Sequence, residues 1–202
     1  MQLEKKSRYL IRQRRELAEL FGFETRNKYE ILDENKNVIG YCAEQQKGFL
    51  GFIMRQFLGH WRSFELHFFN SNRQFVFKSQ HPFRFFFQEF SLVDSHNKTI
   101  GHIRQRFGLF TKKFDAFDEN NRLILEMRSG FLSFWTFPMK NVQGQTQSTI
   151  QKKWSGLFSE IFSDRDNFMI EVHNPNLDQK HHYLFLAAGV FIDLQYFEKK
   201  AD

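Results

Sequence analysis

Cysteine is nearly missing from this chain of 202 residues. Because Cys42 is the only cysteine, the chain can form no internal disulfide and no zinc site made of cysteines. Residues 1–22 are charged throughout and lack an apolar core segment, so we expect no secretion signal. A run of about 20 apolar residues, the length that a membrane-spanning helix needs, is also missing. The longest mostly apolar stretch, residues 183–194, has the length of a buried helix instead.

The signature motifs of common enzyme classes are absent as well. We find no glycine-rich phosphate loop, no HExxH zinc motif and no GxSxG nucleophile elbow. The histidines are dispersed except for His181 and His182. Neighbouring residues of a helix point about 100° apart, so this pair is poorly placed to bind one metal ion. The sequence therefore predicts no catalytic residues and a protein that is not a conventional enzyme.

Phenylalanine and positive charge are in excess. The 28 phenylalanines favour a β-rich fold, because aromatic side chains suit pleated, half-buried surfaces. Most are expected in the core, while a surplus could supply rings to a membrane interface. The net charge of +6 favours anionic partners, either phospholipid headgroups or nucleic acid. No proline- or serine-rich linker divides the chain, which predicts one domain at residues 23–202 after a terminal segment at 1–22.

The terminal segment shows helical spacing. Leu3, Leu10 and Leu17 fall near one face of a predicted amphipathic helix over residues 2–21. A basic amphipathic helix can lie on an anionic membrane, or it can pack against its own domain as an ordinary terminal helix. Both interpretations remain open from the sequence. The basic side chains that crowd this segment are Lys5, Lys6, Arg8, Arg12, Arg14 and Arg15.

From Asn27 onward, apolar residues alternate with polar ones, as in antiparallel strands with one buried face. A loose repeat reinforces this pattern: an apolar strand runs into Asp or Asn, then into a polar turn and a second apolar strand. Asp and Asn suit such turns because their side chains bond the nearby backbone and tolerate left-handed dihedral angles. Consecutive hairpins predict a mainly β fold that closes into a barrel or stacks as a sandwich. The four copies turn at Asp33, Asn70, Asp94 and Asp118.

The end of the chain departs from this pattern. After a last strand near residues 169–172, the centre of residues 181–199 is apolar on every face apart from Asp193. A helix that is apolar all round is buried on all sides, so we expect a barrel with residues 183–197 as its central helix. Asp193 is expected to be hydrogen-bonded near one mouth of the barrel, because buried polar groups are generally satisfied. The predicted central residues are Leu186, Ala188, Val190, Phe191, Ile192 and Asp193.

Two short clusters carry candidate binding chemistry. Asp164 and Asp166 are spaced as at the opening of a calcium loop, which needs hard oxygen ligands. The alternative is a turn or a helix cap, where Asp is common, and Pro175 favours it by standing where a closing Glu normally sits. Basic and aromatic side chains that can bind phosphate and stack on bases come together at Lys152, Lys153 and Trp154.

Five blocks of sequence stand out in order along the chain, and they are residues 23–31, 100–105, 152–157, 162–168 and 187–198. As an ordered set they resemble the phospholipid scramblase family, which belongs to the tubby-like C-terminal fold superfamily. The cysteine-rich run of the animal members is replaced by the segment at 83–90, and their proline-rich N-terminal region is missing. The chain therefore resembles a minimal, bacterial-type member of the family.

This resemblance implies a closed antiparallel tubby-like β-barrel around a buried C-terminal hydrophobic helix. It also implies ATP-independent movement of phospholipids between membrane leaflets, stimulated by calcium, at the cytoplasmic side of a membrane to which the chain is peripheral or in which it is partly inserted. Two carboxylates beside Arg165 predict weak calcium binding, on the order of 10⁻³ M, and no other cofactor is expected. The family's calcium segment falls on Asp164, Asp166, Phe168 and Ile170.

The residues expected to contact lipid are aromatic and basic. The basic side chains of segment 1–22 and the cluster at 152–154 would meet the phosphates of anionic lipids. Consecutive rings must point to both faces of any strand, which makes some of them candidates for insertion. Two alternatives remain: a tubby-like module that binds anionic lipid or a protein partner without moving lipid, and a nucleic-acid-binding protein. The insertion candidates are Phe83, Phe85, Phe86 and Phe87.

Overall fold

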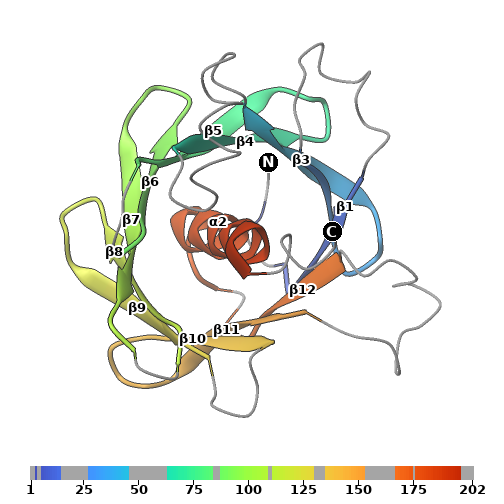
Figure 1. Cartoon of the computed structure of the whole chain (residues 1–202). Helices are drawn as coiled ribbons and strands as arrows, with labels where there is room; N and C mark the ends of the chain where they lie inside the picture. The colour runs from blue at the N-terminus through green and yellow to red at the C-terminus, as the bar shows by residue number, and fades with distance from the viewer. Residues whose placement is uncertain are drawn as a thin grey trace.

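The structure, a computed structural model of the chain, describes residues 3, 6–14, 27–45, 63–83, 87–108, 111–129, 135–152, 167–174 and 176–196. Over these residues it is a closed barrel of twelve antiparallel strands around one helix, α2 (Gln179–Tyr196), as Figure 1 shows. Each strand pairs with its neighbours in sequence, and the last strand closes the barrel by pairing with the first. The predicted mainly β barrel around a C-terminal hydrophobic helix is confirmed.

The strands are β1 (Arg8–Gln13), β2 (Lys28–Leu32), β3 (Val38–Gln45), β4 (Phe64–Asn70), β5 (Phe75–His81), β6 (Glu89–Asp94), β7 (Thr99–Arg106), β8 (Lys113–Asp118), β9 (Leu123–Arg128), β10 (Thr136–Lys140), β11 (Thr146–Gln151) and β12 (Asn167–Val172).

The predicted amphipathic helix at 2–21 is wrong over residues 8–13, which form β1. Tyr9 and Ile11 are fully buried in the barrel core, whereas Leu10 belongs to a separate small cluster. The apolar spacing of this segment fits a helix, but pairing with both β12 and β2 closes the sheet and removes two open edges. Long-range pairing therefore overrides the local helical periodicity. Residues 15–21 of the predicted helix lie outside the described residues.

The predicted Asp and Asn turns are present and share one geometry. In the turn after β6, Oδ1 of Asp94 accepts hydrogen bonds from the backbone N–H groups of His96 (2.8 Å) and Lys98 (2.9 Å). Asn97 has a left-handed φ of 60°, and the strands shift register beside the turn, as expected for a type I turn with a bulge. Equivalent turns begin at Asp33, Asn70, Asp118 and Asn141, with left-handed residues at Lys36, Arg73, Asn121 and Gly144.

The turn at Asn141 is the one that the sequence pattern did not predict. Pro138 lies in β10, just before this turn, and a proline within an apolar run argues against a strand because it cannot donate to the backbone ladder. The polar turn itself, with Gly144 at the left-handed position, follows the same rule as the other four.

The central helix fills the barrel, which explains why it is apolar all round. Phe191 packs against Phe90 with ring centroids 4.4 Å apart, and Tyr183 stacks on Phe77 at 4.3 Å. Gly189 allows a close approach to β12, because a Cβ at this position would lie only 2.6 Å from Cε2 of Phe168. Full burial of each large apolar side chain contributes about 1.5–3 kcal/mol, so the helix is a major source of stability.

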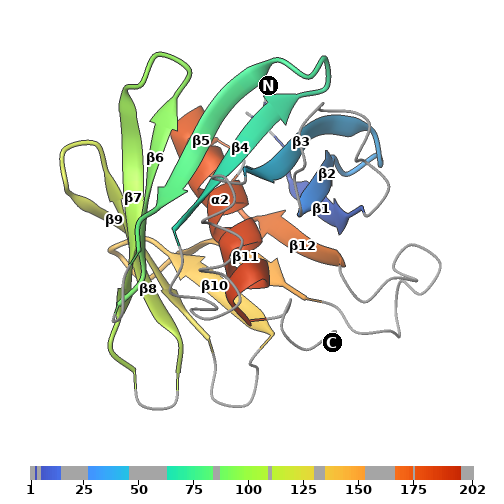
Figure 2. The same ribbon diagram turned by 45° about the horizontal axis from the view of Figure 1, so that its top comes forward.

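The two ends of the barrel differ because successive strands alternate in direction. The five tight turns lie at one end, named here the turn end, and they are residues 33–37, 70–74, 94–98, 118–122 and 141–145. The longer connections begin and end at the opposite end, the loop end, and they are residues 14–27, 46–63, 82–88, 107–112, 129–135 and 152–166. The turns of β4–β5 and β6–β7 are at the top of Figure 2. The helix starts at the turn end, where Lys180 pairs with Glu119, and runs to the loop end.

Candidate functional site

An ion pair buried inside the barrel joins its wall to the central helix. Nζ of Lys152, which directly follows β11, lies 2.8 Å from Oδ1 of Asp193 on α2, and the two side chains are only 6% and 3% exposed. Tyr29 on β2 donates a hydrogen bond of 3.0 Å to the other carboxylate oxygen. Both oxygens of Asp193 are therefore engaged near the loop end of the barrel, as predicted for this residue.

Apolar side chains surround this ion pair. The space beside it is lined by Phe137, Ile150, Phe168 and Ile192. Taking a charged group into such a place costs several kcal/mol, and an oppositely charged partner with further hydrogen bonds offsets that cost. We interpret the pair as a structural lock that holds the last turns of α2 against β2 and β11.

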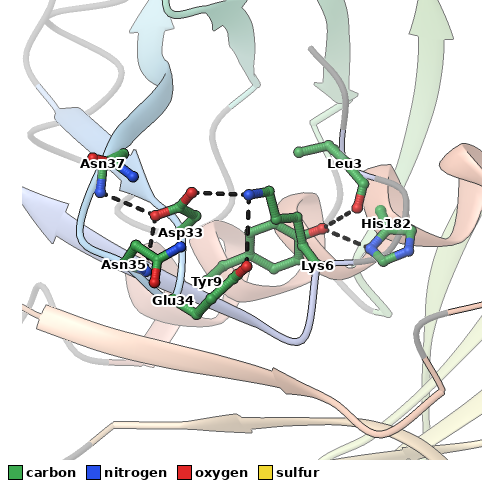
Figure 3. A network of polar contacts seen from close by, with 8 residues as sticks. All are labelled: Leu3, Lys6, Tyr9, Asp33, Glu34, Asn35, Asn37 and His182. Carbon is green, nitrogen blue, oxygen red and sulfur yellow. Dashed lines mark hydrogen bonds and ion pairs between the residues drawn. The ribbon is translucent and has the colours of Figure 1, made fainter.

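A second buried polar contact ties the start of the helix to β1 (Figure 3). The Tyr9 hydroxyl donates to the backbone carbonyl of Leu3 at 3.0 Å and lies 2.6 Å from Nδ1 of His182, which therefore donates to the phenol oxygen. Burial, and next the charge of Glu34, raises the pKa of Tyr9 far above its ordinary value of 10.0. The phenol thus stays protonated and serves as a permanent link between β1 and α2.

The basic side chain of Lys6 is held by acidic groups of the β2–β3 turn. Its Nζ lies 2.8 Å from Oδ2 of Asp33 and 3.6 Å from Oε1 of Glu34, as Figure 3 shows. The hydrogen bond to Asp33 raises the pKa of Lys6. Burial acts to raise the pKa of Asp33, but the bonds from Lys6 and from two backbone N–H groups outweigh it and lower that pKa. Lys6 therefore braces a turn of the barrel.

The arginines on β1 and directly after it are also paired with acidic groups. Arg12 and Arg14 both bind Oε2 of Glu30, at 2.7 and 3.0 Å. Arg8 lies 3.5 Å from Oε1 of Glu171 on β12. The sequence assigned these cations to a lipid-facing helix. Instead, Arg8 and Arg12 lie on β1 and Arg14 directly follows it, and their ion pairs link this strand to its neighbours. Lys5 and Arg15, which belong to the same prediction, lie outside the described residues.

Two of the phenylalanines predicted for membrane insertion are described, and both are exposed. Phe83 and Phe87 are 38% and 50% exposed, at the two sides of the β5–β6 connection. Phe85 and Phe86 lie outside the described residues. This connection belongs to the loop end, so the exposed rings lie at the same end of the barrel as the Lys152–Asp193 pair.

The backbone part of the predicted calcium segment lies in the barrel wall. Phe168 and Ile170 are on β12, which pairs with β1 on one side and β11 on the other, and their side chains face Gly189 of the helix. Asp164 and Asp166 lie outside the described residues. Within the described ranges, no group of three His, Cys, Asp or Glu side chains could hold a metal ion. The calcium site stays a prediction.

The predicted basic cluster at 152–154 is placed only in part. Lys152 points into the barrel toward Asp193, so its ammonium group is not presented to an outside anion. Lys153 and Trp154 lie outside the described residues. A sequence signal for this pair did exist, because the lone acidic residue of an all-apolar helix requires a buried partner. Nothing local identifies Lys152 or Tyr29 as that partner.

Comparison with known proteins agrees with this arrangement. The Scramblase family model matches residues 1–199, which include all twelve strands and the central helix. The chain belongs to the Scramblase family. This family is not a conventional enzyme family, in agreement with the lack of catalytic motifs in the sequence.

Relatives of this family member come from distant organisms. A phospholipid scramblase family protein of Schizosaccharomyces pombe is 25% identical over 80% of the chain, which spans 45% of that protein. Phospholipid scramblase 1 of Homo sapiens is 29% identical over 94% of the chain, which spans 62% of the human protein. The chain thus spans about half to two thirds of the length of these relatives.

A solved structure shares the fold of this chain. An X-ray structure of a protein from Arabidopsis thaliana matches with a TM-score of 0.51 and 12% sequence identity, covering 94% of this chain and 91% of that one. At this identity the likeness concerns the fold alone. Among the described residues of this scramblase family member, no helix is long and apolar enough to cross a membrane.

Proposed function

We propose that the chain is a membrane-associated, phospholipid scramblase-like protein that moves phospholipids between leaflets without ATP. The observation that carries this proposal is the Scramblase family match over residues 1–199, which covers the barrel and its helix together. The net charge of +6 and the exposed rings of Phe83 and Phe87 support a role at an anionic lipid surface. We expect the protein to act from the cytoplasmic side, peripheral to the membrane or partly inserted in it.

Calcium stimulation is part of this proposal. It rests on the resemblance of the segment with Asp164 and Asp166 to the calcium segment of the family. Arg165 between the two carboxylates reduces the negative charge around a bound ion, and calcium affinity falls as ligand charge is removed. We therefore expect an effect of calcium only at concentrations on the order of 10⁻³ M.

A lipid-binding module without transport is the second candidate function. The observation that favours it is the filled barrel: α2 occupies the interior, and its residues from Leu184 to Ile192 that line the core are almost completely buried. The helix therefore lies where a lipid that passed through the barrel would have to move. Any movement of lipid would then take place at the outer surface of the protein, where the bilayer contacts it.

A liposome assay separates these functions. The full chain is reconstituted in liposomes that carry a fluorescent phospholipid, and dithionite then quenches the label in the outer leaflet. Scrambling brings the protected inner-leaflet label to the outside, so the proposal expects quenching beyond the outer-leaflet fraction, without ATP and more strongly with millimolar calcium. Vesicle binding with full protection of the inner leaflet overturns scrambling in favour of the binding module. Failure of both, with retardation of an oligonucleotide in a gel, would indicate a nucleic-acid-binding protein.

A further inference from the structure

The connections at the two ends of the barrel differ in composition. The five tight turns at the turn end contain no phenylalanine, tyrosine or tryptophan. The connections at the loop end hold fifteen of the 28 phenylalanines and all three tryptophans. Among the residues that the structure describes, three phenylalanines at the loop end are exposed, and they are Phe83, Phe87 and Phe107. Exposed aromatic side chains grouped at one end of a domain are typical of a contact surface.

Charge follows the same division. The five tight turns carry four basic and five acidic residues. The connections at the loop end, many of whose residues lie outside the described part of the chain, contain eleven basic and six acidic residues in the sequence. Aromatic rings combined with positive charge are the chemistry of proteins that rest on anionic lipid, where rings sit at the headgroup level and cations meet phosphates.

Two of the connections at the loop end are hydrogen-bonded to each other. Phe87 lies in the β5–β6 connection, and Phe107 begins the β7–β8 connection. Between them, the Gln105 backbone N–H donates to the Gln88 carbonyl at 2.7 Å, and the Gln88 backbone N–H donates to Oε1 of Gln105 at 3.0 Å. These bonds join the two connections next to the exposed rings of Phe87 and Phe107.

The exposure of these rings is large. Phe107 is 70% exposed and Phe87 is 50% exposed, and Phe83 completes the group. Contact between so much apolar surface and water is unfavourable. Burial among lipid headgroups and acyl chains would remove that cost for all three rings together.

We propose that the loop end of the barrel is the face that docks on an anionic phospholipid leaflet, with Phe83, Phe87 and Phe107 inserted at the headgroup boundary. The inference rests on the proposed membrane function and adds an orientation to it. In this orientation the barrel axis points toward the membrane, and the turn end faces away from it. The last turns of α2, with the Lys152–Asp193 pair, lie nearest the lipid. Phe107 is an insertion residue that the sequence pattern alone did not single out.

A binding experiment with matched variants tests the docking face. The test variant is Phe83→Ser/Phe87→Ser/Phe107→Ser. The control is Phe75→Ser/Val142→Ser, which removes exposed apolar side chains at the turn end, where Phe75 is 37% and Val142 59% exposed. Sedimentation with phosphatidylserine-containing vesicles should show roughly tenfold or greater loss of binding for the test variant and little change for the control. Equal loss in both variants would overturn the inference, and far-UV circular dichroism checks that both remain folded.

A site-specific probe gives an independent readout. Because Cys42 is the only cysteine and is buried, a Cys42→Ala background allows one label at a chosen place. An environment-sensitive fluorophore on Phe107→Cys should shift to the blue when phosphatidylserine vesicles are added, and the same label on Val142→Cys should not. A shift at position 142 alone, or at neither position despite vesicle binding, overturns the docking face but leaves the membrane function standing.

The outcomes also separate the inference from the proposed function. Vesicle binding through position 107 without lipid scrambling would support the docking face and contradict scrambling. Complete lack of binding to vesicles, with wild-type protein, would contradict both. In that case, the exposed rings would belong to a contact with a protein.

Discussion

Lys152 and Asp193 are 41 residues apart in sequence, and their side chains meet at 2.8 Å inside the barrel. The contact joins the end of β11 to the last part of the central helix. Because Tyr29 on β2 donates to the second oxygen of Asp193, one carboxylate is held both by β2 and by the residue that follows β11.

Removal of one partner should therefore be costly. We expect Asp193→Ala to destabilise the barrel by about 3–5 kcal/mol, because the Lys152 ammonium group is left buried without its counter-ion. Urea unfolding followed by circular dichroism measures the loss. The control is the double variant Lys152→Met/Asp193→Leu, which replaces both charges with apolar groups and should recover much of the stability. Equal stability of Asp193→Ala and the wild type would show that the pair is not buried.

Gly189 provides a test of the close approach between α2 and β12. An added Cβ would lie 2.6 Å from Cε2 of Phe168, so we expect Gly189→Ala to destabilise the protein by about 1–3 kcal/mol. This direction is opposite to that of helix propensity, which favours Ala over Gly by about 1 kcal/mol. A double-mutant cycle with Phe168→Leu should show coupling, because the smaller side chain relieves the clash. A stabilising Gly189→Ala change would contradict the packing.

The turn after β6 predicts an acid-dependent loss of stability. Backbone hydrogen bonds, that of Lys98 foremost, hold the pKa of Asp94 below its ordinary value of 3.8, although burial acts in the opposite direction. A lowered pKa means that the charged form is favoured in the folded state. Its contribution is therefore fully present above the unfolded pKa and is lost as the pH falls through the folded pKa.

We expect Asp94→Asn to reduce the difference in stability between pH 7 and pH 3. Asn is compatible with this turn, since Asn141 accepts the same backbone bonds in the β10–β11 turn. The reverse change, Asn141→Asp, should increase the pH dependence and serves as the matched control. Thermal unfolding of the three proteins across this pH range provides the measurement, and parallel profiles would count against the hydrogen-bonded carboxylate.

Calcium binding can be measured directly. Calorimetric titration of the wild type should show weak binding, on the order of 10⁻³ M, that is lost in Asp164→Asn/Asp166→Asn. Sub-micromolar affinity lost in the variant would contradict the weak site proposed here. Heat that is the same in both proteins would assign these aspartates to a turn or a cap instead.

Much of the barrel can be predicted from the sequence because its signals are local. The turn at Asp94 needs only an acceptor side chain and a left-handed residue three positions later, and both are visible in five residues. The central helix is predictable because a helix with apolar side chains on every side is stable only when protein surrounds it. These features depend on neighbours within a few positions along the chain.

The features that could not be predicted depend on distant residues. Residues 8–13 have the spacing of a helix, and they become a strand because Tyr9 pairs with Ile170, which lies near the other end of the chain. Asp193 clearly required a partner, but Tyr29 lies 164 residues away, and no local pattern connects the two. The exposure of Phe107 likewise depends on how the β7–β8 connection leaves the barrel.

The central helix follows all twelve strands in the chain, and this order has a consequence for biosynthesis. A ribosome makes every strand of the wall before it makes the element that fills it. Until α2 is made, nothing covers the apolar side chains on the inner faces of the barrel strands. A chain that is released before Gln179 would thus expose these apolar side chains to water. Premature termination should therefore lead to degradation or aggregation instead of a partly active protein.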